Sequence, residues 1–409
     1  MAYPNDGIKT SQYVSEKYLD ILTSSLSIIP GVTRDIHGDL DISKARKVGQ
    51  TAQCKRPAKV KTFDGRTYQS QPYIEDTVDI KFDKQLHTGP EFDIDELAQE
   101  LAKLDSALMP FAKQHGSDLE SWFASDWVGT SGDVSIGSNS GTIQFKDYLL
   151  AGANLTNNTA TGYPRTAVMD PLTKVNALDK MLENRTEDSE SLKKLFREGI
   201  VARAASFDFV ESTRLPVIAI PADIIGAVAV SYVEGSSLLL IGGLTDGQIF
   251  EAGTPITVVG ANQILPDTRK NTGRLKQIII KETATVGAVV TGQLNAVIDP
   301  LYYTSTDARQ NISAQPVATD VTGSAPGVVA GKVYRQSVCF DERAFGFYST
   351  ALKKLPGLDG QAANFDNINV LYSAGGDIKE MDAIYRYDTL TAGVNFYPEY
   401  VQRIWEENI

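Results

Sequence analysis

The side chains that most often carry out chemistry in proteins are few in this chain and lie far apart along it. The three histidines, His37, His87 and His115, have no second His or Cys close by, so none has the spacing of a zinc ligand pair. Residues 137–141 read Gly-Ser-Asn-Ser-Gly, with Asn where a nucleophile elbow has Ser. A Ser/His triad therefore has almost no material to use, and each histidine is interpreted more simply as a solvated loop residue.

Phosphate-binding and cation-binding motifs are also missing. No two of the 33 glycines are separated by a single residue, so the Gly-x-Gly core of a dinucleotide or kinase loop does not occur. Gly331-Lys332 is followed by Val333, where a P-loop has a hydroxyl residue for magnesium. We therefore expect no cofactor, no metal and no enzymatic activity. A hydrolase that uses dispersed carboxylates is the least supported alternative, because spacing alone places no acid beside a base.

Length and charge narrow the classes further. The 409 residues have an ordinary globular composition and could form two or three domains. Asp and Glu number 51 against 39 Lys and Arg, and a net charge of −12 disfavours wrapping of nucleic acid. Cys54 and Cys339 are too few to staple the chain, which indicates isolated thiols in a reducing compartment. The most apolar stretch, 215–233, is broken by two prolines and an aspartate, so we expect no membrane span.

Positive charge is gathered between Lys44 and Arg66. This stretch has eight basic side chains and one acidic one, Asp64, a local charge of +7. The basic residues are Lys44, Arg46, Lys47, Lys55, Arg56, Lys59, Lys61 and Arg66. A solvated surface and a docking site for an acidic partner are both consistent with this pattern. Asp64-Gly65 is a dipeptide typical of two-residue turns, and it predicts an extended, charged hairpin with strands at 60–63 and 66–68.

A long amphipathic helix is the strongest helical prediction. It begins at Asp93 as N-cap and has one apolar stripe with spacings of three and four residues. The stripe consists of Ile94, Leu97, Leu101, Leu104, Leu108 and Phe111. Pro110 is expected to kink or break this helix, with Ser117 and Glu120 capping a continuation. A shorter helix is expected before it, around residues 15–25.

The remainder of the chain mixes strand and helix patterns. Val78, Ile80 and Phe82 alternate with charged residues, as in a half-buried strand. Residues 217–265 contain four acids and no base among many Val, Ile, Leu and Gly, which indicates a compact, barrel-like β insertion, with 305–328 as the linker leading out of it.

Patterns of both kinds flank this insertion. An extended stretch at 166–169 precedes two helices, one bearing Val175, Leu178 and Leu182 and one bearing Leu192, Leu195 and Phe196. Asp341 is expected to cap a helix that runs to Pro356. Strands are expected at 368–372, 383–387, 394–397 and 400–405, with a turn at 375–377 between the first two.

The order of these parts resembles a known family. The residues that carry the resemblance are Gly199-Ile200 leading to Ala205–Asp208, Leu215-Pro216, 254–260 continued by Thr272–Gln277, Ala344-Phe345 through Leu355-Pro356, and Tyr385–Leu390 before Gly393. Together they resemble the major capsid proteins of tailed bacteriophages with the Hong Kong 97 fold. Within that group the chain is most similar to the coat proteins of short-tailed Salmonella phages, which carry an insertion domain. The resemblance covers roughly residues 45–405, and it is the order of the motifs that carries it.

The resemblance implies an α+β fold of the Hong Kong 97 type with an inserted small β-barrel. In this numbering the parts are an N-terminal arm at 1–50, an extended loop and peripheral-domain strands at 51–92, a spine helix and peripheral domain at 93–160, a first part of the axial domain at 161–216, the inserted barrel at 217–328, and a second part of the axial domain with the C-terminal return strand at 329–409.

The resemblance also implies a function and partners. The function is self-assembly of hexamers and pentamers into an icosahedral head around double-stranded DNA, bound without sequence specificity. A scaffolding protein and a portal protein guide assembly in the host cytoplasm, and the product is part of the virion, with no membrane. The fold's namesake links a loop lysine covalently to a neighbour's asparagine. Lys59 and Lys61 could occupy that loop, although the relatives with an insertion do without crosslinks.

The basic loop supplies the candidate subunit interface. It consists of Lys55, Arg56, Lys59, Lys61, Phe63, Arg66, Tyr68 and Tyr73. We expect the charges to lie on an acidic neighbour and the aromatic side chains to act as anchors. An alternative of another class is a carbohydrate- or receptor-binding viral surface protein that forms a small oligomer, suggested by the charge-poor β middle.

Overall fold

The computed structural model describes most of the chain and confirms the α+β class. The described residues are 11–34, 48–93, 104–138, 141–183, 203–222, 229–299, 301–304, 307–316, 322–353, 359–377 and 382–407. Their contacts divide into two compact units, and each unit is built from separate stretches of sequence. The first unit contains 1–56, 76–123 and 346–394, and the second contains 57–75, 124–345 and 395–409.

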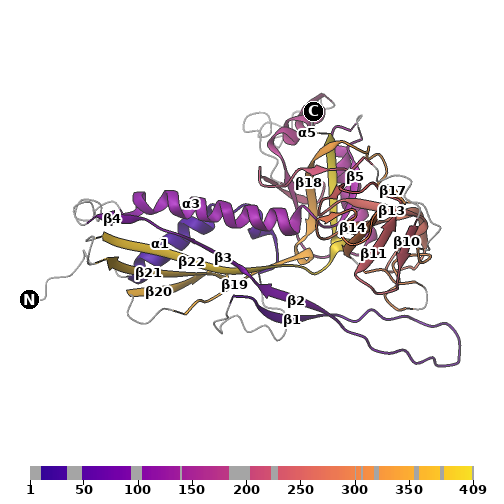
Figure 1. The fold of residues 1–409 in the computed structure, drawn as a ribbon, viewed down its shortest axis with the longest axis horizontal. Helices are drawn as coiled ribbons and strands as arrows, with labels where there is room; N and C mark the ends of the chain where they lie inside the picture. The colour runs from indigo at the N-terminus through magenta and orange to yellow at the C-terminus, as the bar shows by residue number, and fades with distance from the viewer. Residues whose placement is uncertain are drawn as a thin grey trace, which may run out of the picture. The chain divides into compact units, whose positions relative to one another are not determined.

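The first unit is a long sheet covered by helices (Figure 1). The sheet has the order β19–β22–β21–β20, and β3 and β4 also pair with β22. The strands are β3 (Lys84–Thr88), β4 (Glu91–Asp93), β19 (Phe345–Thr350), β20 (Asp359–Phe365), β21 (Ile368–Asp377) and β22 (Asp382–Asn395). Helix α1 (Ser11–Ser24) packs against α3 (Leu104–Phe123) and against β20 and β21. A separate ladder of β1 (Gln50–Arg56) and β2 (Asp76–Phe82) completes this unit.

Two buried polar side chains of α3 hold the N-terminal region in place. The Glu120 carboxylate accepts hydrogen bonds from the backbone N–H groups of Ser27, Ile28 and Ile29, at the start of the short η1 turn (Ile29–Gly31). His115 is 2% exposed, and Tyr18 of α1 lies 2.9 Å from its Nδ1. The interpretation of His115 as a solvated loop residue was therefore wrong, because this histidine faces α1 from the middle of a helix.

The helix α3 continues through Pro110, so the expected break does not occur. A proline inside a helix removes one backbone hydrogen bond and costs about 3 kcal/mol. Four side chains along one face of α3 are fully buried, and their burial outweighs this loss. They are Leu108, Ala112, Leu119 and Phe123. The predicted start of the helix, with Ile94, Leu97 and Leu101, lies outside the described residues.

The second unit has a mixed sheet as its body, in the order β5–β23–β18–β6–β8–β7. The strands are β5 (Asp133–Ile136), β6 (Arg165–Met169), β7 (Arg203–Ala204), β8 (Phe207–Glu211), β18 (Val333–Asp341) and β23 (Val401–Glu407), with β9 (Ile218–Ala219) pairing with β18. Helix α4 (Phe145–Asn157) packs on β18 and β23 and contacts α5 (Pro171–Glu183). Both the strand expected at 166–169 and the helix around Val175 are confirmed, and the helix expected around Leu192 lies outside the described residues.

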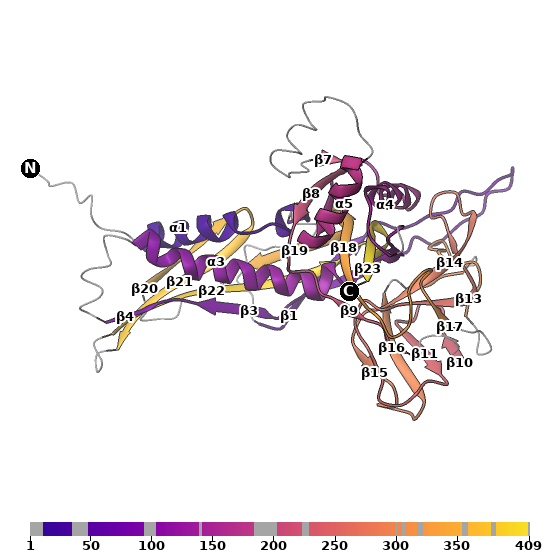
Figure 2. The same ribbon diagram turned by 90° about the horizontal axis from the view of Figure 1, so that it is seen from above.

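A second sheet occupies the region where the insertion was expected, in the order β10–β11–β16–β14–β13–β17 (Figure 2). Its strands are β10 (Ala229–Tyr232), β11 (Leu238–Gly242), β13 (Pro255–Ile264), β14 (Asn271–Ile280), β16 (Gln293–Asp299) and β17 (Thr322–Ser324). A small ladder joins β12 (Ile249–Phe250) to β15 (Ala284–Thr285). No ladder joins the outer strands β10 and β17 within the described residues, and the closed barrel therefore stays a prediction.

Two further predictions in the C-terminal part were wrong. Asp341 caps only the short η4 turn (Glu342–Ala344), and the expected helix is instead the strand β19, all six residues of which are buried. A strand covered on both faces is a continuous apolar run, which also satisfies helical spacing. Gly375–Asp377 belong to β21 and pair with 382–384 of β22, so the turn expected at these residues was wrong.

Candidate assembly surface

The candidate surface begins at a regular ladder. Strands β1 and β2 are antiparallel, and Arg56 stands opposite Asp76 at the end of the ladder. The alternation predicted for β2 is confirmed, since Ile80 and Phe82 are fully buried while Asp79, Lys81 and Asp83 beside them are exposed. Lys55 and Arg56 lie in the last two positions of β1. Burial raises the pKa of the Cys54 thiol beside them, which keeps this cysteine protonated.

Beyond the ladder, residues 57–75 form a long loop without strands. Pro57, directly after the last paired residue Arg56, has no backbone N–H to continue the ladder. The Gln71 side chain continues the connection, because its amide accepts from Lys61 N–H at 2.7 Å and donates to Lys61 C=O at 2.7 Å. Lys61 and Gln71 are equally far from the paired residues Arg56 and Asp76, so the ladder register centres the reversal on Arg66. The predicted two-residue turn at Asp64-Gly65 was therefore wrong.

The aromatic anchors predicted in this loop are exposed. Tyr68 is 89% exposed, Tyr73 is 71% exposed and Phe63 is 40% exposed. Val60 and Ile74 of the same loop are also exposed. Large apolar side chains gathered on one exposed segment are typical of an interaction surface.

Contacts within the second unit hold the basic side of the loop. Lys59 Nζ lies 3.1 Å from Glu399 Oε1, and Arg269 donates to the C=O of Val60 at 3.2 Å. The Arg309 side chain lowers the pKa of Asp307 by hydrogen bonding, and Lys61 adds to this lowering. The acidic partners of Lys59 and Lys61 in this structure thus belong to the same chain, and spacing in the sequence gives no signal for Glu399 or Asp307. An ion pair as exposed as that of Lys59 with Glu399 contributes about 0–1 kcal/mol to stability. The carboxylate of a neighbouring subunit can therefore replace Glu399 at little cost.

The predicted interface residues are thus divided between two elements. Lys55 and Arg56 lie on the ladder of the first unit, while Lys59, Lys61, Phe63, Arg66, Tyr68 and Tyr73 lie on the loop assigned to the second unit. Lys44, Arg46 and Lys47, which contribute to the local charge, lie outside the described residues. Sequence reasoning missed Gln71, whose role depends on the register of a ladder.

No three side chains among the His, Cys, Asp and Glu residues that the structure describes gather in a way that could hold a metal ion. Among the same described residues, no helix is both long and apolar enough to cross a membrane.

Comparison with known proteins gives similarity only at the level of structure. No protein-family model and no curated protein matches the sequence. The structure is similar to a chain of Mycobacterium phage Che8, with 11% identity, 93% of this chain and 91% of that chain covered, and a TM-score of 0.45. It is similar to the capsid structure of Cyanophage P-SCSP1u, with 10% identity, coverage of 92% and 90%, and a TM-score of 0.41.

A third similar structure is the virus-like particle from Pyrococcus furiosus, with 10% identity, coverage of 96% and 97%, and a TM-score of 0.39. The chain is thus similar, over nearly its whole length, to a chain of a mycobacteriophage, to a cyanophage capsid and to a virus-like particle. With identities of 10–11% and TM-scores of 0.39–0.45, this similarity does not assign a function to the chain.

Proposed function

We propose that this protein is the major capsid protein of a tailed bacteriophage and assembles with copies of itself into an icosahedral head around double-stranded DNA. The observation that carries the proposal is the loop 57–75, which exposes Tyr68, Tyr73 and Phe63 on a basic segment. Aromatic side chains of this kind contribute most of the energy at protein interfaces when a partner buries them. A closed shell requires each subunit to bind several copies through such heterologous surfaces.

The proposal includes the Hong Kong 97 fold with an inserted barrel, and the narrower similarity to coat proteins of short-tailed Salmonella phages. The sheet β10–β17 over residues 229–324 supports an insertion, because both of its ends lead back to strands of the body sheet, β9 and β18. Scaffolding and portal proteins are proposed as partners on the resemblance alone. The net charge of −12 suits a wall that encloses DNA without binding it tightly.

Electron microscopy of the expressed full chain tests this function, with and without the products of neighbouring genes. We expect closed shells. A small, defined oligomer under every condition would contradict the proposal and favour the receptor-binding alternative.

A double variant ties the assembly to the loop. Tyr68→Ser with Tyr73→Ser should lower shell yield strongly, because the loss of two anchors costs about 2 kcal/mol or more at each contact. The matched control is Val289→Ser with Val290→Ser, which removes exposed apolar side chains elsewhere and should leave the yield unchanged. If the shell yield of the tyrosine double variant equals that of the valine double variant, the loop does not contribute to the contacts between subunits.

A further inference from the structure

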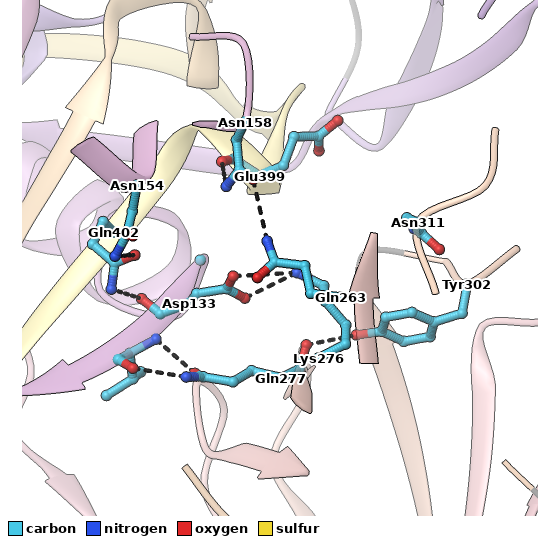
Figure 3. Close-up of polar contacts among 12 residues, drawn as sticks. Asp133, Asn154, Asn158, Gln263, Lys276, Gln277, Tyr302, Asn311, Glu399 and Gln402 are labelled. Atoms are coloured by element: carbon cyan, nitrogen blue, oxygen red, sulfur yellow. Dashed lines mark hydrogen bonds and ion pairs between the residues drawn. The ribbon is translucent and has the colours of Figure 1, made fainter. Parts of the chain in front are cut away.

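A cleft of about 1010 Å³ lies within the second unit, and amide side chains dominate its polar lining. The carboxamides are Asn154, Asn157, Asn158, Gln263, Gln277 and Gln402. They come from the end of α4, from β13 and β14, and from β23, and Figure 3 shows five of them around Asp133. Leu265, Leu275 and Pro326 add apolar surface, and none of the described residues that line the cleft has an aromatic ring. A sugar ring would therefore find no flat surface on which to stack.

Amide side chains in this protein already bind peptide backbone. The Gln277 amide donates to Val134 C=O at 2.7 Å and accepts from Val134 N–H at 2.7 Å. The Gln71 amide holds Lys61 in the same two-bond manner outside the cleft. A carboxamide offers one acceptor and two donors, which match the groups of an extended backbone. The cleft thus presents several groups suited to an extended peptide.

Three hydrogen bonds between side chains of the cleft are 3.2–3.5 Å long and can be exchanged, whereas Asn158 also donates to Glu399 C=O at 2.9 Å and Gln402 to Asp133 C=O at 3.1 Å. Asn154 Nδ2 lies 3.5 Å from Gln402 Oε1, and Arg274 Nη1 lies 3.4 Å from Asn154 Oδ1. Gln263 Nε2 lies 3.2 Å from Asn158 Oδ1. Strong N–H to O bonds cluster near 2.9 Å, so a ligand backbone could replace these contacts with better ones.

Charge in the cleft favours an acidic ligand. The Asp133 carboxylate is neutralised by Lys276, whose Nζ lies 3.0 Å from Oδ1 (Figure 3). Arg274 is exposed, and no ion pair joins it to a carboxylate among the described residues. A guanidinium in this position can bind a carboxylate through two hydrogen bonds. The loop 57–75 has a net charge of +1, from Lys59, Lys61 and Arg66 against Asp64 and Glu75. Arg274 therefore does not attract this loop of a second copy, which argues for a different protein as the partner.

We propose that this cleft binds an extended peptide segment of another protein, with the cleft amides bonding its backbone and Arg274 pairing with one acidic side chain. The proposal does not depend on shell assembly, since it concerns the residues of one chain. It would hold equally for a subunit that forms only a small oligomer.

Selection from a library of short random peptides, with the full-length protein as target, tests the proposal. We expect the selected peptides to share one Asp or Glu at a fixed position. Measured by fluorescence anisotropy, Arg274→Glu should weaken their binding by about tenfold or more, which corresponds to about 1.4 kcal/mol. Lys270→Glu is the matched control, because Lys270 is exposed just before β14, the strand that contains Arg274, but does not line the cleft, and peptide binding by this variant should be unchanged.

Backbone recognition has its own test. Methylation of single backbone nitrogens in a selected peptide should abolish binding at two or more positions, since each methyl group removes a donor. The proposal is overturned if no peptide is selected, if binding survives Arg274→Glu, or if methylation has no effect. It is also overturned if an acidic oligosaccharide such as a galacturonate oligomer binds in place of the peptides, or if the cleft of one copy is filled by a second copy.

Discussion

Protonation of one buried histidine should make this protein less stable in mild acid. Burial is the largest cause that lowers the pKa of His115 from 6.5 to about 4, and the nearby charge of His87 acts in the same direction. The carboxylates of Asp118 on the same helix and Asp388 on β22 act in the opposite direction. The neutral ring bridges two hydroxyls, with Tyr18 Oη 2.9 Å from Nδ1 and Thr389 Oγ1 2.9 Å from Nε2. The charged ring donates from both nitrogens, so the hydroxyl that now donates to the neutral ring would have to turn and accept instead.

The sign and size of the effect follow from proton linkage. Between pH 6.5 and about 4 the unfolded chain binds a proton at His115 and the folded chain does not, so the free energy of unfolding falls as the pH falls. Each pKa unit corresponds to about 1.4 kcal/mol, so the total loss is about 3 kcal/mol. Above pH 6.5 the contribution is complete, and below about 4 no further loss arises from this group.

Denaturant unfolding of the full chain and of His115→Gln, followed by circular dichroism at several pH values, measures this loss. The stability difference between the two proteins should shrink by about 3 kcal/mol from pH 7 to pH 4, because only the natural chain has the titrating ring. A difference that stays constant from pH 7 to pH 4 would refute the reasoning. If that variant does not fold, direct titration of the ring by NMR gives the same answer.

Three other predictions concern the loop, a buried arginine and the insertion. Charge reversal at Lys55, Arg56 and Lys59 together should lower the yield of shells while the subunit stays soluble, and an unchanged yield in electron micrographs would contradict the docking role. Arg403 is fully buried and donates to the carbonyls of Gly129, Gly132 and Gly253 at 2.7–3.2 Å. Arg403→Met should therefore lower the free energy of unfolding by about 3–5 kcal/mol, and a loss below about 1 kcal/mol in denaturant unfolding would count against this. A fragment of residues 217–328 should fold alone and show β structure by circular dichroism, and a disordered spectrum would argue against an insertion.

Sequence reasoning succeeded where the pattern was local. The alternation in β2 and the apolar spacing in α5 and α3 each depend on residues within one element, and all three elements are present. It failed where the deciding partner is distant in sequence. The helix passes through Pro110 because α1 and the sheet bury its other face, and β19 is a strand because it pairs with β22, more than thirty residues away.

The candidate interface was predicted only in part. The composition of the loop singled out Tyr68, Tyr73 and the basic residues as candidates, and the two tyrosines are exposed, while their role in an interface stays a prediction. Its turn could not be placed, because the register depends on pairing between β1 and β2 and on the Gln71 side chain. The amide cleft has no signature in the sequence, since its side chains come from four separate strands or helices.

The position of β23 has a consequence for how the protein is made. This strand lies between β5 and β18 in the body sheet, yet its residues, 401–407, are translated after every other described strand. A ribosome must therefore complete the chain to this point before the centre of that sheet can close. The first unit likewise cannot complete its fold until residues up to 394 have been translated. Prematurely terminated copies would lack a finished body, and so unfinished subunits would be excluded from whatever larger structure the protein builds.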